Sequence, residues 1–243
     1  MGSHETLLSA SAVQKSFGAL VVLDGIDFEI QSGDAIGIVG PNGAGKTTLL
    51  NVLSGAHKAS TGFINFRGTD VTHLDAAQRC RLGIARTHQI PRPFSGMTVF
   101  ENVLAAAMQG GKFGRDEAYE RSIDAIRLCG MLKLANRRAE TIGLLDRKRL
   151  ELTRALATNP IVLLLDEIGG GLTDGEAAEL VETIRVLHQR GISIVWIEHI
   201  VHVLLQVANR LVCMDSGRVI ADGNPQEVLA NSTVVDAYLG GGR

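Results

Sequence analysis

The run from Gly40 to Thr48, which reads Gly-Pro-Asn-Gly-Ala-Gly-Lys-Thr-Thr, limits the possible folds of this chain more than any other segment. It follows an apolar segment at 35–39 that is typical of a buried strand, and it precedes a helical pattern that begins near Lys46. Between a strand and a helix, such glycines let consecutive backbone N–H groups surround phosphate oxygens, and the helix N-terminus adds a positive field. The sequence therefore predicts a nucleotide phosphate site here rather than an ordinary glycine-rich turn.

Two side chains of this loop have the chemistry that a nucleotide phosphate requires. Lys46 brings a positive charge to the β- and γ-phosphates, and the hydroxyl of Thr47 can bind Mg²⁺. The residues that we expect to contact the nucleotide are Gly40, Asn42, Gly43, Ala44, Gly45, Lys46, Thr47 and Thr48.

Length and composition describe a globular protein with a sizeable core. The 243 residues are 45% hydrophobic and 21% charged, with a formal net charge of −2. This near-neutral balance argues against a nucleic-acid-binding domain, which usually carries a basic excess. Cys80, Cys129 and Cys213 are few and far apart, so we expect free core thiols in a reducing compartment. The longest apolar runs, 161–165 and 192–197, are too short to cross a bilayer, so a membrane link would need a partner protein.

The order of the predicted elements indicates an α/β fold with an inserted helical segment. Strand-like alternation and turns surround the phosphate loop in residues 5–91. Residues 92–142 are instead predicted to form a small helical subdomain, whose first helix has a capping box made by Thr98 and Glu101. From 143 to 239, buried strands alternate with helices, which is typical of a parallel sheet covered by helices on both faces.

Polar side chains follow two of the predicted buried strands. Asp166 and Glu167 come directly after the segment 161–165, and His199 comes shortly after the segment 192–197. Ligand sites in parallel sheets lie at the carboxyl ends of the strands. There Asp166 could hold Mg²⁺, and Glu167 could orient or deprotonate the water that attacks the γ-phosphorus. We expect His199 to reach the γ-phosphate and to hold Glu167 in place, although all three side chains could instead cap the helices that follow.

These motifs, in this order, resemble the ATP-binding subunits of ABC transporters over nearly the whole chain, from about Leu7 to Leu239. The segment 83–103 is similar to the Q-loop of the family. Its sequence most resembles that of the branch that takes up hydrophobic, branched-chain amino acids. By this resemblance, Phe17 stacks on adenine and Gln89 senses Mg²⁺ and the γ-phosphate. The alternative for Phe17 is an ordinary core aromatic at the end of a strand.

The resemblance also implies a fold and a set of site residues. The fold is a P-loop NTPase core of the ABC ATPase type, with a parallel sheet covered by helices, an antiparallel β subdomain and an inserted helical subdomain. The implied catalytic residues are Glu167, His199 and Lys46. The implied Mg²⁺ ligands are Thr47, Gln89 and Asp166.

The sequence departs from the family just before a helix that we expect to begin at Arg147. A signature of the Leu-Ser-Gly-Gly-Gln type should contact ATP held by a second subunit, but the segment 142–146, Ile-Gly-Leu-Leu-Asp, stands in its place. Gly143 lacks the serine hydroxyl, Leu145 adds bulk where the backbone should approach phosphate, and Asp146 adds a negative charge. We expect Asp146 to be the N-cap of the helix rather than a phosphate ligand.

The resemblance implies a subunit that binds and hydrolyses ATP to power an ABC transporter, with import of branched-chain amino acids or a related small polar or amphipathic solute as its expected task. Its expected partners are a second ATPase subunit with an intact signature, or an identical copy, and two membrane-spanning permease subunits served by a solute-binding protein. It would lie on the cytoplasmic face of the cell membrane, with no nucleic-acid partner. Two alternatives stay open: a regulatory ABC module with weak hydrolysis, and a soluble ABC ATPase that serves no transporter.

Overall fold

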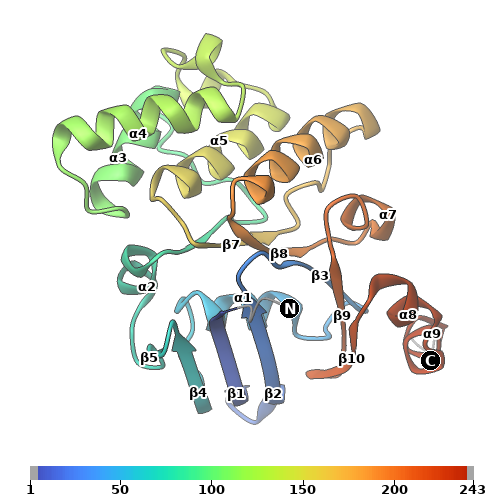
Figure 1. Ribbon diagram of the computed structural model, residues 1–243. Helices are drawn as coiled ribbons and strands as arrows, with labels where there is room; N and C mark the ends of the chain where they lie inside the picture. Colours follow the sequence, from blue (N-terminus) through green and yellow to red (C-terminus); the bar gives the residue numbers. More distant parts are fainter. Residues whose placement is uncertain (1–4, 240–243) are drawn as a thin grey trace. The chain divides into compact units, whose positions relative to one another are not determined.

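The computed structural model, drawn in Figure 1, describes residues 5–239. The chain divides into two compact units. One unit is formed by Met1–Ala76 together with Ser193–Arg243, and the other by Ala77–Ile192. The phosphate loop and His199 belong to the first unit, whereas Gln89 and the carboxylates at 166 and 167 belong to the second.

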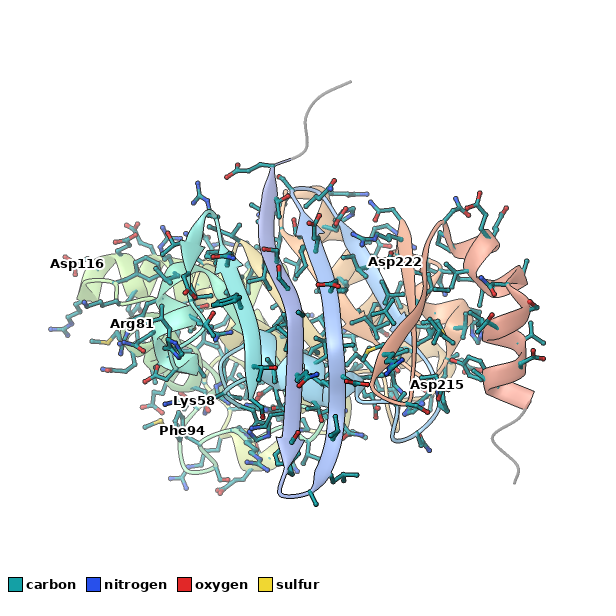
Figure 2. All side chains as sticks on the ribbon, turned by 90° about the horizontal axis from the view of Figure 1, so that it is seen from below. Lys58, Arg81, Phe94, Asp116, Asp215 and Asp222 are labelled. Carbon is teal, nitrogen blue, oxygen red and sulfur yellow. The ribbon has the colours of Figure 1, made fainter. Side chains whose placement is uncertain are left out.

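The first unit contains an antiparallel sheet with the strand order β2-β1-β4-β5. Its strands are β1 (Thr6–Phe17), β2 (Leu20–Gln31), β4 (Thr61–Phe66) and β5 (Thr69–Asp70). In β2 the buried residues Ile26, Phe28 and Ile30 alternate with exposed ones, because one face of the sheet packs on the core. Figure 2 shows β1 and β2 side by side along their length, in agreement with a pairing that runs from Thr6 opposite Gln31 to Phe17 opposite Leu20.

The same unit contains parallel strands that place the phosphate loop. β3 (Ala35–Val39) pairs in parallel with β8 (Ser193–Ile197) and with β9 (Arg210–Asp215), and β10 (Arg218–Gly223) is antiparallel to β9. Every residue of β3 and β8 is buried, as expected for apolar strands that are covered on both faces. The helices of this unit are α1 (Lys46–Leu53), α7 (Val201–Leu204), α8 (Pro225–Ala230) and α9 (Ser232–Leu239).

An ion pair joins the two strands of the β9–β10 hairpin. The Arg210 guanidinium on β9 donates two hydrogen bonds of 2.6 Å to the carboxylate of Asp222 on β10, which is labelled in Figure 2. This bidentate contact raises the pKa of Arg210 above its usual value. The ion pair therefore fixes β10 against β9 just before the chain continues into α8 and α9.

The second unit combines two parallel strands, β6 (Ile84–Arg86) and β7 (Val162–Asp166), with the longest of the described helices. Its helices are α3 (Val99–Gln109), α4 (Arg115–Leu128), α5 (Leu144–Ala157) and α6 (Asp174–Gln189), while α2 (Ala76–Leu82) lies at its boundary. Two short 3-10 turns occupy Leu132–Leu134 and Ala139–Thr141. In Figure 1, α3 lies against α4 and α5.

Local sequence signals explain where two of these helices begin. Thr98 accepts the backbone N–H of Glu101 while Glu101 accepts that of Thr98, which confirms the predicted capping box at the start of α3. Thr173 and Glu176 form the same reciprocal pair at the start of α6. The starts of α3 and α6 are therefore fixed by their own local sequence.

The predicted combination of an antiparallel sheet, parallel strands and a helical insertion is confirmed. Division of the chain at 91 and 142 into subdomains stays a prediction. The three cysteines are free thiols, and Cys129 and Cys213 are buried as expected, whereas Cys80 is half-buried. Among the described helices, none combines the length and the apolar character that a membrane span needs.

Candidate functional site

The phosphate loop lies between β3 and α1, as the sequence predicts. Gly45 stands at the N-cap of α1 with φ of 97°, a left-handed conformation that favours glycine. A Cβ atom at Gly45 would stand 2.9 Å from the carbonyl oxygen of Val22 and 2.9 Å from a methyl group of Leu23. Gly45, as the N-cap of α1, forms no side-chain cap hydrogen bond. A helix N-terminus is a position that favours an anionic ligand.

The Lys46 ammonium lies against the loop itself. Lys46 is only 6% exposed, and its Nζ donates hydrogen bonds to the carbonyl oxygens of Gly40 at 2.7 Å and of Pro41 at 2.9 Å. Phosphate oxygens are stronger acceptors of the same N–H groups than neutral carbonyls are. Thr47, the next residue, is exposed. The loop thus holds the ammonium group in place, and its contact with a nucleotide phosphate stays a prediction.

A tyrosine from the end of the described chain contacts the first glycine of this loop. The backbone N–H of Gly40 donates a hydrogen bond of 2.8 Å to the hydroxyl of Tyr238 on α9. A Cβ atom at Gly40 would stand 2.0 Å from the carbonyl oxygen of Met214, so the loop also packs tightly against β9. Sequence reasoning missed Tyr238, because the contact joins residues 198 positions apart.

Phe17 lies at the end of β1 with its ring accessible. Its side chain is 46% exposed, so the alternative of a core aromatic does not hold. The ring meets His57 edge-on with a centroid separation of 5.4 Å, and Lys15 Nζ lies 4.8 Å from the ring centroid. An accessible aromatic face is what adenine stacking requires, and that role of Phe17 stays a prediction.

Asp166 ends β7, where the sequence places it, but its carboxylate already has a cationic partner. Arg86 ends the neighbouring strand β6, and its Nη2 atom lies 2.7 Å from Asp166 Oδ2. The two side chains are only 10% and 2% exposed, so the ion pair is almost completely removed from water. Sequence reasoning missed Arg86, because only strand pairing brings the two residues together.

Glu167 follows in a left-handed conformation, with φ of 46°. This conformation is uncommon for a residue with a side chain, and its occurrence beside a predicted catalytic carboxylate indicates a constrained segment. The Glu167 carboxylate accepts a hydrogen bond from Nε2 of Gln89. Two residues that the sequence assigns to the same site are thus in direct contact.

Lys148 on α5 contacts both Gln89 and Glu167. Its Nζ donates hydrogen bonds to the carbonyl oxygen of Gln89 at 2.7 Å and to that of Glu167 at 3.3 Å. No local pattern predicts these contacts, because they join Lys148 to residues 59 and 19 positions away.

His199 follows β8 in the first unit and is exposed, whereas the preceding residue, Glu198, is buried and accepts a hydrogen bond from Trp196 Nε1 at 3.3 Å. α7 begins at Val201 with Ile200 as its N-cap, so His199 does not cap this helix. The predicted contact of His199 with the γ-phosphate stays a prediction.

The expectation that Asp146 caps a helix starting at Arg147 is wrong. α5 begins earlier, at Leu144, and its N-cap is Gly143 in an extended conformation without a side-chain hydrogen bond. The residues after Gly143 are good helix formers, so the helix continues toward the glycine. Asp146 therefore lies in the first turn, where its charge is favourable for the helix dipole, and it forms an ion pair of 3.8 Å with Arg149.

Comparison with known families and relatives agrees with this geometry. Residues 23–169 match the family model "ABC transporter", and residues 218–243 match "Branched-chain amino acid ATP-binding cassette transporter". The chain is 34% identical to the high-affinity branched-chain amino acid transport ATP-binding protein LivG of Salmonella typhimurium, over 97% of this chain and 98% of that protein. It is 30% identical to the corresponding protein BraF of Pseudomonas aeruginosa, over 96% of this chain and 98% of that protein.

Solved structures share the fold over the same length. A nucleotide-free ATP-binding cassette from an ABC transporter has a TM-score of 0.88 and 30% identity, covering 96% of this chain and 98% of that one. The ADP conformation of an ATP-binding cassette of an ABC transporter has a TM-score of 0.87 and 30% identity, covering 97% and 99%. These likenesses confirm the predicted fold and the predicted resemblance, and the chain therefore belongs to the ABC transporter family, as one of its ATP-hydrolysing cassettes.

Proposed function

We propose that this chain hydrolyses ATP to power the import of branched-chain amino acids, or of a related small polar or amphipathic solute. The observation that carries the proposal is similarity over the full length to proteins named for that transport, together with the C-terminal match at 218–243. The chain acts from the cytoplasmic face of the cell membrane, bound to two permease subunits that receive cargo from a solute-binding protein.

ATP binds to the phosphate loop with its adenine stacked on Phe17. Backbone N–H groups from Asn42 to Gly45 surround the β- and γ-phosphates. Lys46 exchanges its hydrogen bonds with the carbonyls of Gly40 and Pro41 for hydrogen bonds with phosphate oxygens. The left-handed conformation of Gly45 and the exposed ring of Phe17 support this assignment. His199 donates a hydrogen bond to the γ-phosphate from its own exposed position after β8.

Mg²⁺ would be held by the Thr47 hydroxyl, the Gln89 amide oxygen and the Asp166 carboxylate. These oxygen donors are the kind that Mg²⁺ prefers, and a bound Mg²⁺ would neutralise charge on the transferred phosphate. Because Asp166 is already bound to Arg86, the direction of the carboxylate is fixed before the ion arrives. Arg86 thus positions the Asp166 carboxylate for Mg²⁺ and does not take the place of the ion.

Glu167 orients or deprotonates the attacking water. Its carboxylate accepts a hydrogen bond from Gln89, and this side-chain contact competes with a water molecule for the Glu167 oxygens. Engagement of Gln89 with Mg²⁺ and the γ-phosphate would loosen it. Hydrolysis would then wait until the nucleotide has been bound correctly.

The partner ATPase is proposed to be a different chain with an intact signature. In this chain Gly143 has no hydroxyl, Leu145 is half-buried, and Asp146 lies in the first turn of α5, where a facing phosphate would approach. A like-charge pair at ~6 Å and an effective dielectric of ~20 opposes binding by roughly 2–3 kcal/mol. The ion pair with Arg149 reduces this repulsion. We therefore assign a complete Walker half-site and a weak signature half-site to this chain.

Domain roles follow from the same proposal. Residues 5–91 and 143–239 form the ATP-binding core, and residues 92–142 form the helical subdomain. Closure of the ATPase dimer would be passed to the permeases through the region from Gln89 to Val103.

The test is Mg²⁺-dependent ATP hydrolysis by the purified chain, alone and mixed with candidate partners that carry an intact signature. Activity that appears only in the mixture and is lost with Glu167→Gln supports the asymmetric transporter ATPase. Leucine uptake into vesicles that hold the complete complex then tests the cargo. Equal activity of the chain alone would contradict the weak signature half-site.

A regulatory module that binds ATP with little turnover is the second candidate, and the altered signature at 142–146 favours it. Lys46, Asp166, Glu167 and His199 are all present, which counts against it. Nucleotide binding without turnover in every mixture would establish this second function.

A further inference from the structure

Lys148 is a buried lysine in the second turn of α5. It is 4% exposed, although lysine is rarely buried unless its ammonium has partners. Its Nζ donates to two backbone carbonyl oxygens, that of Gln89 at 2.7 Å and that of Glu167 at 3.3 Å. One ammonium therefore joins the backbones of the two segments that carry the Q-loop glutamine and the catalytic carboxylate.

The side chains of the same two residues close a cycle. Gln89 Nε2 donates to the Glu167 carboxylate, so the two residues are linked once through their side chains and once through the Lys148 ammonium. Both lie just beyond the paired strands β6 and β7, which align the segments up to residues 86 and 166. Beyond the ends of the strands, Lys148 holds the two segments together through the carbonyl oxygens of Gln89 and Glu167.

The backbone of Glu167 requires such a support. Its φ of 46° is unfavourable for a residue with a side chain. The Glu167 carbonyl oxygen accepts hydrogen bonds from Lys148 Nζ and from the backbone N–H of Gly170, each at 3.3 Å. These two donors hold the peptide group that fixes the direction of the Glu167 side chain.

Packing alone does not hold Gln89 and Glu167 in place without the hydrogen bonds from Lys148. Gln89, Lys148 and Glu167 line an open pocket of about 340 Å³ in the second unit. Side chains that border open space have fewer neighbours to hold them, so hydrogen bonds decide their position. Loss of the ammonium would leave two carbonyls without this donor and two segments with room to separate.

We propose that Lys148 is a positioning residue for ATP hydrolysis, which holds Gln89 and Glu167 at the separation that the reaction requires. The inference rests on the proposed ATPase function. Because Lys148 belongs to α5, whose first turn is the signature position, it also links that position to the catalytic carboxylate. A movement of the first turn of α5 would therefore be passed to Glu167 by the Lys148 side chain.

The test compares Lys148→Met with Lys148→Arg in the complete ATPase complex. Methionine keeps the apolar stem and removes the ammonium, so we expect kcat to fall about tenfold or more, with KM for ATP within about twofold. Arginine supplies several N–H donors and should recover most of kcat. In a Gln89→Ala background, Lys148→Met should lower kcat by no more than about twofold, because the two residues act through one cycle.

A second readout does not depend on turnover. Amide hydrogen exchange in the nucleotide-free chain should accelerate in residues 87–91 and 167–171 of Lys148→Met and stay unchanged elsewhere. Lys133→Met, a change at an exposed lysine of the same unit, is the matched control and should alter neither readout.

The outcomes separate this inference from the proposed function. Unchanged kcat and unchanged exchange in Lys148→Met would overturn the positioning role, as would accelerated exchange throughout the chain without recovery by Lys148→Arg. If the wild-type complex hydrolyses no ATP, the proposed function fails, and exchange in residues 87–91 and 167–171 alone decides whether Lys148 positions them.

Discussion

The hydroxyl of Tyr238 accepts a hydrogen bond from the backbone N–H of Gly40, at 2.8 Å, and so joins α9 to the first residue of the phosphate loop. Partial burial raises the pKa of this hydroxyl, which therefore stays protonated at neutral pH. The last described helix thus contributes a neutral polar contact to the loop.

Tyr238→Phe removes that contact and little else. A typical hydrogen bond contributes about 1 kcal/mol, so we expect ATP and ADP affinity to fall about fivefold. Titration with a fluorescent nucleotide analogue measures the change. Tyr119→Phe, at an exposed tyrosine of α4, is the control. Equal affinity of Tyr238→Phe and the wild type would mean that the loop holds its shape without α9.

Arg86→Leu should strongly destabilise the protein. It leaves the buried Asp166 carboxylate without its cationic partner, and breaking a buried ion pair on one side typically costs about 3–5 kcal/mol. Urea unfolding gives the loss of stability. Arg127→Leu removes an exposed pair with Asp124 and should change stability by less than about 1 kcal/mol. A similar small change for both variants would show that Asp166 is stabilised by other groups.

Gly45→Ala should abolish measurable nucleotide binding. The new Cβ atom would stand 2.9 Å from the Val22 carbonyl oxygen, so the loop must shift in addition to bearing an unfavourable φ. Gly68→Ala is a matched control, because Gly68 has φ of 76° but no atom within 4 Å of the added Cβ. Equilibrium binding of ATP separates the two effects, and equal losses in both variants would assign the defect to backbone strain alone.

Thiol reactivity should follow burial. Burial raises the pKa of Cys129 and of Cys213 to about 11, so at pH 8 only about one thiol in a thousand is ionised at each. Cys80 is half-buried and has a raised pKa as well. Mass spectrometry after iodoacetamide treatment should find slow labelling of Cys80 and none of the other two until the protein unfolds. Early labelling of Cys129 would indicate local opening of α4.

Local motifs allowed much of this protein to be predicted from its sequence. The phosphate loop, the strand that ends in Asp166 and the capping box at Thr98 each depend on a few consecutive residues. The helix start after the signature position could not be predicted correctly, because Asp146 is a good N-cap in isolation and only the folded chain shows that Gly143 takes this role.

Contacts between distant residues explain what the sequence did not reveal. Arg86 and Asp166 are 80 positions apart, Lys148 and Gln89 are 59 apart, and Tyr238 and Gly40 are 198 apart. Each contact depends on strand pairing or helix packing that no local pattern encodes. These three side chains contact residues of recognised motifs without belonging to a motif themselves.

The left-handed backbone of Glu167 has a consequence for how this position can vary. Glycine at 167 would relieve roughly 1 kcal/mol of conformational strain, partly offset by the greater freedom of glycine in the unfolded chain. Glu167→Gly should therefore unfold at a urea concentration no lower than the wild type while losing ATP hydrolysis, and a marked destabilisation would contradict this account. At this position glycine favours the stability of the fold, whereas glutamate favours ATP hydrolysis. Selection for stability and selection for turnover therefore act in opposite directions on a single residue.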